Sequence, residues 1–298
     1  MTLRLFIDPC DFCEPLDSME MGDFVRYAGT MPTAIVSIYS PEGFVIAADG
    51  FSTTGDGDAQ KIFPIADSPT AAYAISGWAG VSDEDIGLDI SFEAECRAVA
   101  SSLNWDGFVD LNTYGETFAR TVGVQIQQEI AKARVCGAIS ESDYTEKIAN
   151  CDRWCLLHFN GYFRGVPSMA AWSILFHLDQ SSVNQYYSWQ PVLGDARNFY
   201  GSTVILDLLK SGGDSGYFDK YKTPSFKKLI TRGGVSLQEA IQAASSYIEA
   251  CSDPEADAMD GKCKCIGGKT HIATITPTEG FRWALGPITT CPNTPPLA

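Results

Sequence analysis

Two apolar segments joined by a short turn constrain the fold of this chain more than any other feature. Residues 33–39 are rich in β-branched side chains, and residues 44–48 are almost wholly apolar. The turn between them has Pro41 at its second and Gly43 at its fourth position, as a type I turn favours. This pattern predicts a β-hairpin whose two strands are apolar on both faces. Such a hairpin has to be covered on both sides of its sheet.

The rest of the chain alternates between blocks of strands and blocks of helices. Thr113 with Glu116, and Ser236 with Glu239, have the spacing of a capping box at a helix start. Apolar residues then recur along one face of each of these helices. We expect further strands at 61–65, 71–75, 169–178, 185–189, 198–201, 270–275 and 281–283, and helices at 92–103, from 113 to about 130, and at 236–251.

This order of elements predicts an α+β fold. Strands that are apolar on both faces, together with helices in separate blocks, indicate two packed sheets with helices outside them, a four-layer αββα sandwich. We find neither an internal repeat nor a clear linker within the patterned region. The sequence therefore predicts one domain at 33–285, preceded by a leader at 1–32 and followed by a Pro-rich tail at 286–298.

Composition excludes several classes of protein. The chain has 298 residues, of which 45% are hydrophobic, and 37 Asp and Glu against 21 Lys and Arg give a net charge of −16. The hydrophobic share argues against a mainly disordered chain, and the acidic excess argues against binding of a nucleic-acid backbone. No apolar run approaches the ~18 residues of a membrane span. Because the N-terminus lacks the pattern of a secretory signal, we expect a cytoplasmic protein.

Ten cysteines are more than such a protein needs. In a cytosol we expect them to be reduced, as small buried apolar groups. Cys10 and Cys13 have CxxC spacing, but no second CxxC follows at a zinc-ribbon distance. A metal-binding module built from these two residues with Cys263 and Cys265 is an alternative, whereas the main expectation is that there is neither a metal nor a cofactor.

Several segments resemble, in the same order, the proteasome-type N-terminal-nucleophile hydrolases, the superfamily of proteasome β subunits and related bacterial peptidases. The resemblance implies the αββα sandwich and an N-terminal threonine that attacks an amide carbonyl, with its own α-amino group accepting the proton. An α-amine suits this role because its ordinary pKa, about 7.7–8.0, lies near working pH. The matching segments are residues 33–38, 43–50, 61–65, 75–77, 200–202, 236–251 and 267–268.

The resemblance assigns roles to five residues. Thr33 is the nucleophile, and Asp49, sixteen positions later, matches the carboxylate that holds the family's lysine. Lys61 matches that lysine. Gly77 fits the glycine whose N–H stabilises the oxyanion, and Ser202 fits the serine that contacts the terminal amine. Taken singly, each has an ordinary structural alternative, such as a turn cap for Asp49 or a surface lysine for Lys61.

The chain also departs from the family pattern. Pro32 stands where a Gly usually precedes the nucleophile, and its missing N–H and fixed φ change the bond that must be cleaved. Cys263 and Ile266 stand where the family has Asp and Ser. Asp260 is close to Cys263 in the sequence, and it replaces the family's Asp at that position if the loop between the two residues bends.

Two functions follow as hypotheses. The first is a threonine-type hydrolase that cleaves amide bonds, with a peptide or protein as its expected substrate, after autocleavage before Thr33. The second is a non-catalytic member that keeps the sandwich and an unprocessed N-terminus for assembly or binding. The resemblance also leads us to expect a homo-oligomer, with a ring as the family's frequent form, and the composition leads us to expect no nucleic-acid or membrane partner.

Overall fold

The computed structural model describes residues 33–51, 58–77, 80–83, 88–137, 140, 142, 153–176, 180–194, 196–211, 216–231 and 233–287. Several features singled out from the sequence lie outside this part of the chain. They are the leader at 1–32 with Cys10, Cys13 and Pro32, and residues 288–298 of the tail.

The first sheet is built on the hairpin that the sequence predicts. Ile35 pairs with Ala48 and Ser40 pairs with Gly43, so the two strands and the turn lie where expected. The sheet is antiparallel in the order β10-β1-β2-β11-β12. Its strands are β1 (Ile35–Ser40), β2 (Gly43–Asp49), β10 (Arg197–Tyr200), β11 (Thr270–Thr276) and β12 (Gly280–Leu285).

The second sheet is also antiparallel, in the order β3-β4-β7-β8-β9. Its central strand β7 was not predicted from the sequence. A separate two-stranded ribbon pairs β5 (Gly80–Asp83) with β6 (Leu88–Ser91). The strands of the second sheet are β3 (Ile62–Ile65), β4 (Ser68–Gly77), β7 (Arg153–Phe163), β8 (Val166–Phe176) and β9 (Ser181–Trp189).

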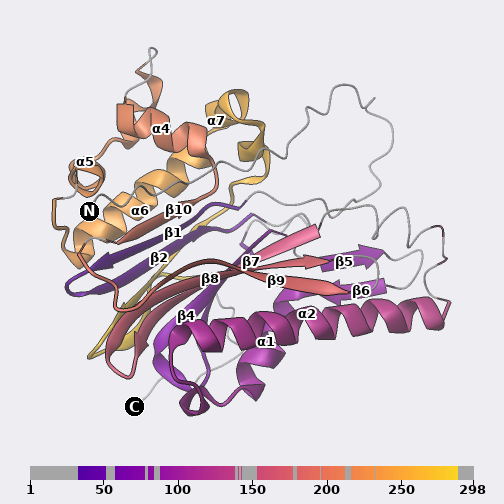
Figure 1. Cartoon of the computed structure of the whole chain (residues 1–298). Coiled ribbons are helices and arrows are strands. Elements are labelled where there is room, and N and C mark those ends of the chain that lie inside the picture. The colour runs from indigo at the N-terminus through magenta and orange to yellow at the C-terminus, as the bar shows by residue number, and fades with distance from the viewer. Residues whose placement is uncertain are drawn as a thin grey trace, which may run out of the picture.

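The helices fall into two groups on opposite sides of the sheets (Figure 1). Helices α1 and α2 lie beside the second sheet, and α6 crosses β1 and β2 of the first. The helices are α1 (Phe92–Ser102), α2 (Leu111–Val135), α4 (Thr203–Ser211), α5 (Pro224–Ile230), α6 (Leu237–Cys251) and α7 (Pro254–Met259), with 3-10 turns η1 (Trp105–Gly107), η3 (Tyr217–Tyr221) and η4 (Gly261–Cys265).

Apolar side chains fill three separate layers. One cluster packs α1 and α2 on the second sheet, where the Phe118 ring lies 5.1 Å from Tyr73 and 5.3 Å from Phe159. Another packs α4 to α7 on the first sheet, and the third lies between the two sheets, with Phe44 and Met169 from opposite sheets. Each large side chain buried in these layers contributes about 1.5–3 kcal/mol. Both faces of β1 and β2 are therefore covered, as their apolar sequence requires.

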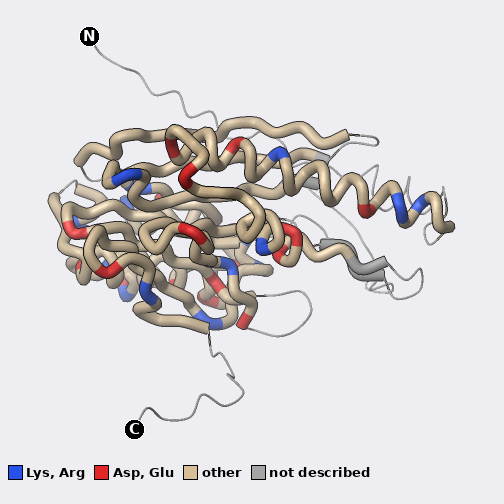
Figure 2. Tube along the Cα trace, turned by 90° about the horizontal axis from the view of Figure 1, so that it is seen from below, with Lys and Arg blue, Asp and Glu red and all other residues tan. Residues whose placement is uncertain are grey.

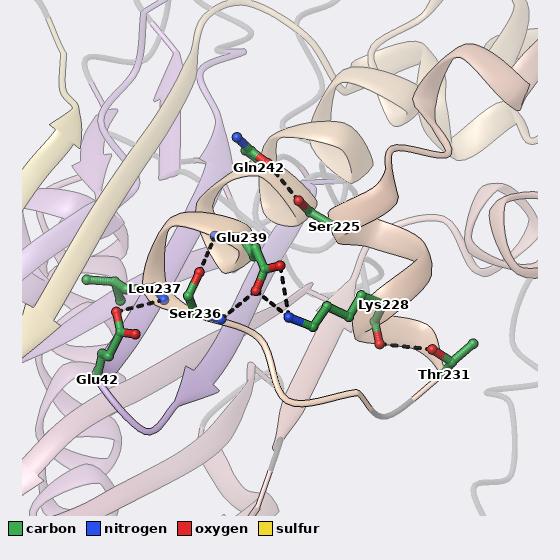
Figure 3. A network of polar contacts seen from close by, with 8 residues as sticks. All are labelled: Glu42, Ser225, Lys228, Thr231, Ser236, Leu237, Glu239 and Gln242. Atoms are coloured by element: carbon green, nitrogen blue, oxygen red, sulfur yellow. Dashed lines mark hydrogen bonds and ion pairs between the residues drawn. The ribbon is translucent and has the colours of Figure 1, made fainter.

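The structure confirms one of the two helix starts predicted from capping-box spacing and corrects the other. Ser236 and Glu239 form the predicted capping box at α6, and Glu42 from the β1–β2 turn accepts a hydrogen bond from Leu237 N at 3.1 Å (Figure 3). Helix α2, however, begins at Leu111 rather than Thr113. Asp110 is its N-cap and accepts from Thr113 N at 2.7 Å, because an Asp at this position satisfies a free helical N–H directly.

The mixed α+β class is confirmed by these two antiparallel sheets and their helices. None of the described helices combines the length and the apolar character that crossing a membrane requires. Acidic and basic residues are interspersed along the described chain (Figure 2).

Candidate active site

A buried carboxylate, Asp49, lies at the end of β2 and is fully inaccessible to solvent. Its Oδ1 accepts a hydrogen bond from Ala34 N at 2.9 Å. Its Oδ2 accepts from Phe51 N at 3.2 Å and from Gly267 N at 3.4 Å, and it forms an ion pair with Lys61 Nζ at 2.9 Å. Four donors compensate the cost of holding a carboxylate away from water. These four donors come from separate segments and fix the position of the Asp49 side chain.

Lys61 joins this carboxylate to the candidate nucleophile. Its Nζ lies 2.9 Å from Asp49 Oδ2 and 3.4 Å from Thr33 Oγ1. The side chains of Lys61 and Thr33 are 12% and 2% exposed, respectively. The Lys61 carbonyl accepts from Ile75 N at 2.9 Å, which ties the lysine to β4. The structure therefore brings together the three residues that the sequence pattern placed in one site.

Ser202 lies beside the start of β1. Tyr200 pairs with Ile35 in the antiparallel register of β10 and β1, so two further steps align Ser202 with Thr33. Gly201 permits this approach, since its φ is +131° and a Cβ there would lie 3.2 Å from the Ala34 Cα. The Ser202 side chain also begins α4, because its Oγ accepts from Ile205 N at 3.0 Å.

Gly77 is the last residue of β4 and has a φ of +91°, a conformation that glycine adopts at little cost. It lies two residues beyond Ile75, which bonds to Lys61. Gly77 therefore ends β4 at the same end of the sheet at which Lys61 precedes β3.

Asp260 is the carboxylate beside Ser202. Its Oδ2 accepts a hydrogen bond from Ser202 Oγ at 2.6 Å. Its Oδ1 accepts from Lys262 N at 3.0 Å, which turns the chain from α7 into η4. The turn into η4 therefore holds the Asp260 carboxylate against the Ser202 hydroxyl.

A half-buried thiol, Cys265, lies near the Lys61–Asp49 pair. Burial raises the pKa of the Cys265 thiol, with Asp49 adding to the rise and Lys61 opposing it. No disulfide joins any two of the described cysteines.

Sequence reasoning missed a second group of charges next to the site. Asp58 binds His271 Nε2 through Oδ1 at 2.7 Å and Lys269 Nζ through Oδ2 at 2.8 Å. His271 is completely buried, and Ala59 N donates to Gly50 O at 2.8 Å in the same loop. These contacts hold Asp58 against the start of β11 and Ala59 against Gly50. No sequence signal links Asp58 with residues more than 200 positions away.

The chemistry available at this site is that of a hydroxyl next to an ammonium group. The Lys61 ammonium can stabilise negative charge that develops on Thr33 Oγ1, and Asp49 holds it in place. Within the described residues, no three His, Cys, Asp or Glu side chains are arranged to hold a metal ion. The alternative cysteine metal site includes Cys10 and Cys13, which lie outside those residues.

A scan against models of known protein families finds none that matches this chain, and a search of curated proteins finds no matching relative.

Proposed function

We propose that this protein is a threonine-type hydrolase of the N-terminal-nucleophile kind, which cleaves amide bonds with Thr33 after autocleavage between Pro32 and Thr33. The observation that carries the proposal is the placement of Lys61 Nζ, 2.9 Å from the buried Asp49 and 3.4 Å from Thr33 Oγ1. We further propose that the two sheets and their outer helices form the four-layer αββα sandwich of the proteasome type.

Autocleavage would use the same hydroxyl as the hydrolysis of substrates. Thr33 Oγ attacks the Pro32 carbonyl, the C–N bond breaks, and the resulting ester is hydrolysed by water. The leader leaves with a carboxylate at Pro32, and Thr33 gains a free α-amine. That amine can then accept the Oγ proton when the hydroxyl attacks a substrate carbonyl.

Ser202 and Gly77 would complete the mechanism. Ser202 lies two residues beyond Tyr200, which pairs with Ile35, and this supports a contact of its hydroxyl with the freed α-amine of Thr33. The backbone N–H of Gly77 would stabilise the oxyanion of the tetrahedral intermediate. A peptide or protein substrate, and a homo-oligomer that forms a ring, are part of this proposal.

The test compares the wild-type protein with Thr33→Ser and Thr33→Ala by intact mass and N-terminal sequencing. We expect wild type and Thr33→Ser to begin at residue 33, because both carry a hydroxyl, and Thr33→Ala to retain the leader. An epoxyketone should label processed wild type at residue 33. Lys61→Met should slow this labelling at least 10-fold, since the ammonium next to Oγ1 is lost.

The second candidate is a non-catalytic subunit of the same fold, favoured by Pro32 at the position before Thr33. It predicts that wild type keeps the mass of the whole chain and that the epoxyketone leaves Thr33 unmodified. That pair of results would exclude the hydrolase.

A further inference from the structure

The layer between the two sheets contains two buried polar side chains whose hydrogen-bonding groups are not paired. Asn160 on β7 is fully buried, and neither its Oδ1 nor its Nδ2 is hydrogen-bonded to any of the described residues. Ser37 on β1 is 1% exposed, and its Oγ likewise has no partner in this part of the chain. Burying an amide or a hydroxyl without a partner is costly, and folded proteins satisfy nearly all such groups with protein atoms or ordered water.

The alternation of side chains along the two strands directs both residues into this layer. Side chains two positions apart on a strand lie on the same face of the sheet. Tyr162, two residues after Asn160, belongs to the apolar cluster between the sheets. Ile35, two residues before Ser37, belongs to the same cluster. Asn160 and Ser37 therefore both point into the space between the sheets.

A ring contact across the layer aligns β7 with β1 on one side of the two residues. The His158 ring lies 5.5 Å from the ring of Tyr200, and Tyr200 pairs with Ile35. His158 comes two residues before Asn160, just as Ile35 comes two residues before Ser37. The two strands thus lie level with one another at this point.

A second ring contact aligns the strands on the other side. The Tyr162 ring lies 5.4 Å from the ring of Phe44, and Phe44 pairs with Tyr39. Tyr162 comes two residues after Asn160, and Tyr39 comes two residues after Ser37. Asn160 and Ser37 therefore occupy corresponding positions between the two ring contacts and face one another across the layer.

The side chains around the two residues are polar but uncharged. Asn198 pairs with Ser37 in the β1–β10 register and donates from Nδ2 to the Tyr187 hydroxyl at 3.2 Å. That hydroxyl lies 3.5 Å from His158 Nδ1, and His158 Nε2 lies 3.5 Å from Ser76 Oγ. Burial lowers the pKa of His158 to about 3, so its imidazole is neutral at pH 7. A molecule bound among these groups has to be uncharged, since none of them offers a counter-charge.

We propose that Asn160 and Ser37 form a buried hydration site, in which water bridges the two sheets. Asn160 supplies a donor and an acceptor, and the Ser37 hydroxyl can act as either. Water matches this set because it is uncharged, donates and accepts, and makes about three hydrogen bonds when it is buried. The bridge would satisfy both side chains at once. This inference does not depend on the proposed hydrolase activity.

The experiment is a crystal structure of the wild-type protein at a resolution that shows ordered water. The expected result is density for a water molecule within about 3.2 Å of both the Asn160 amide and Ser37 Oγ. A direct hydrogen bond between Asn160 and Ser37, or a layer without water between them, would overturn the proposal.

A measurement in solution compares the wild type with the double variant Ser37→Ala/Asn160→Leu. Leucine has about the size of asparagine but no polar atoms, so the variant should hold at least one long-lived internal water fewer by oxygen-17 magnetic relaxation dispersion. Asn184→Leu changes an exposed asparagine on β9 and should leave the number of internal waters as in wild type.

Equal numbers of internal waters in the wild type and in a double variant that retains the wild-type circular dichroism spectrum would contradict the hydration site. If the double variant does not fold, the wild-type crystal structure decides the question by itself.

Discussion

Asp49 shows how one residue of the site depends on its surroundings. It is fully buried, and the donors that stabilise its charge come from the start of β1, the end of β2, Lys61 and Gly267. The resemblance to the N-terminal-nucleophile hydrolases predicted that Thr33, Asp49 and Lys61 belong to one site. The contribution of the Gly267 N–H could not be predicted, because it comes from a segment 218 positions away.

We predict that Asp49→Asn destabilises the protein by about 3 kcal/mol, since it leaves the nearly buried Lys61 ammonium without its counter-charge. The measurement is urea unfolding at pH 7. Asp207→Asn is the matched control, because it breaks an exposed pair with Lys210 and should cost less than about 0.5 kcal/mol. Equal effects of the two substitutions would contradict a structural role for the buried pair.

At the scale of elements, local signals predicted the ends of some helices and strands well. The β1–β2 hairpin, α1 and α6 lie where turn residues, periodicity and caps indicated. Strand β7 was missed because it carries His158, Asn160 and Gly161 in its interior, which are not typical of a buried strand. Its neighbours β4 and β8 supply the pairing that such a sequence does not predict by itself.

The capping box of α6 gives a test at this scale (Figure 3). Ser236→Ala removes the hydroxyl that accepts from Glu239 N at 3.2 Å, so we expect a loss of about 1 kcal/mol in the free energy of unfolding. Ser245→Ala, in the middle of the same helix, is the control and should be close to neutral because alanine favours helix. Thermal unfolding of both variants measures the difference, and a neutral Ser236→Ala would argue against the cap.

At the scale of the whole molecule, the layer between the two sheets contains a buried histidine. His158 on β7 lies 3.5 Å from the Tyr187 hydroxyl, and its ring lies 5.5 Å from that of Tyr200 on the opposite sheet. Burial lowers the pKa of His158 to about 3. The folded protein therefore keeps this side chain neutral at pH values where the unfolded chain, with an ordinary histidine pKa of about 6.5, binds a proton.

This difference predicts a loss of stability in acid. Between pH 6.5 and pH 3 the unfolded state holds one more proton than the folded state, so the contribution of His158 falls by about 1.4 kcal/mol per pH unit as the pH decreases. His158→Gln removes this dependence. Denaturant unfolding at pH 8, 6 and 5 should show a shallower decline for the variant than for wild type. Parallel declines would show that His158 is not held neutral by the fold.

The sequence by itself determined the hairpin at the start of the domain, the α+β class, and the spacing of Thr33, Asp49 and Lys61. The hairpin and the α+β class depend on local patterns, namely β-branched runs, turn residues and caps, which act between residues close in the chain. Only the tertiary structure decided that Asp260 accepts a hydrogen bond from Ser202 and that Asp58 binds His271. The first contact joins the start of α4 to the turn between α7 and η4, and the second joins Asp58 to β11. Both depend on how segments far apart in the chain pack together, which the spacing of residues in the sequence does not encode.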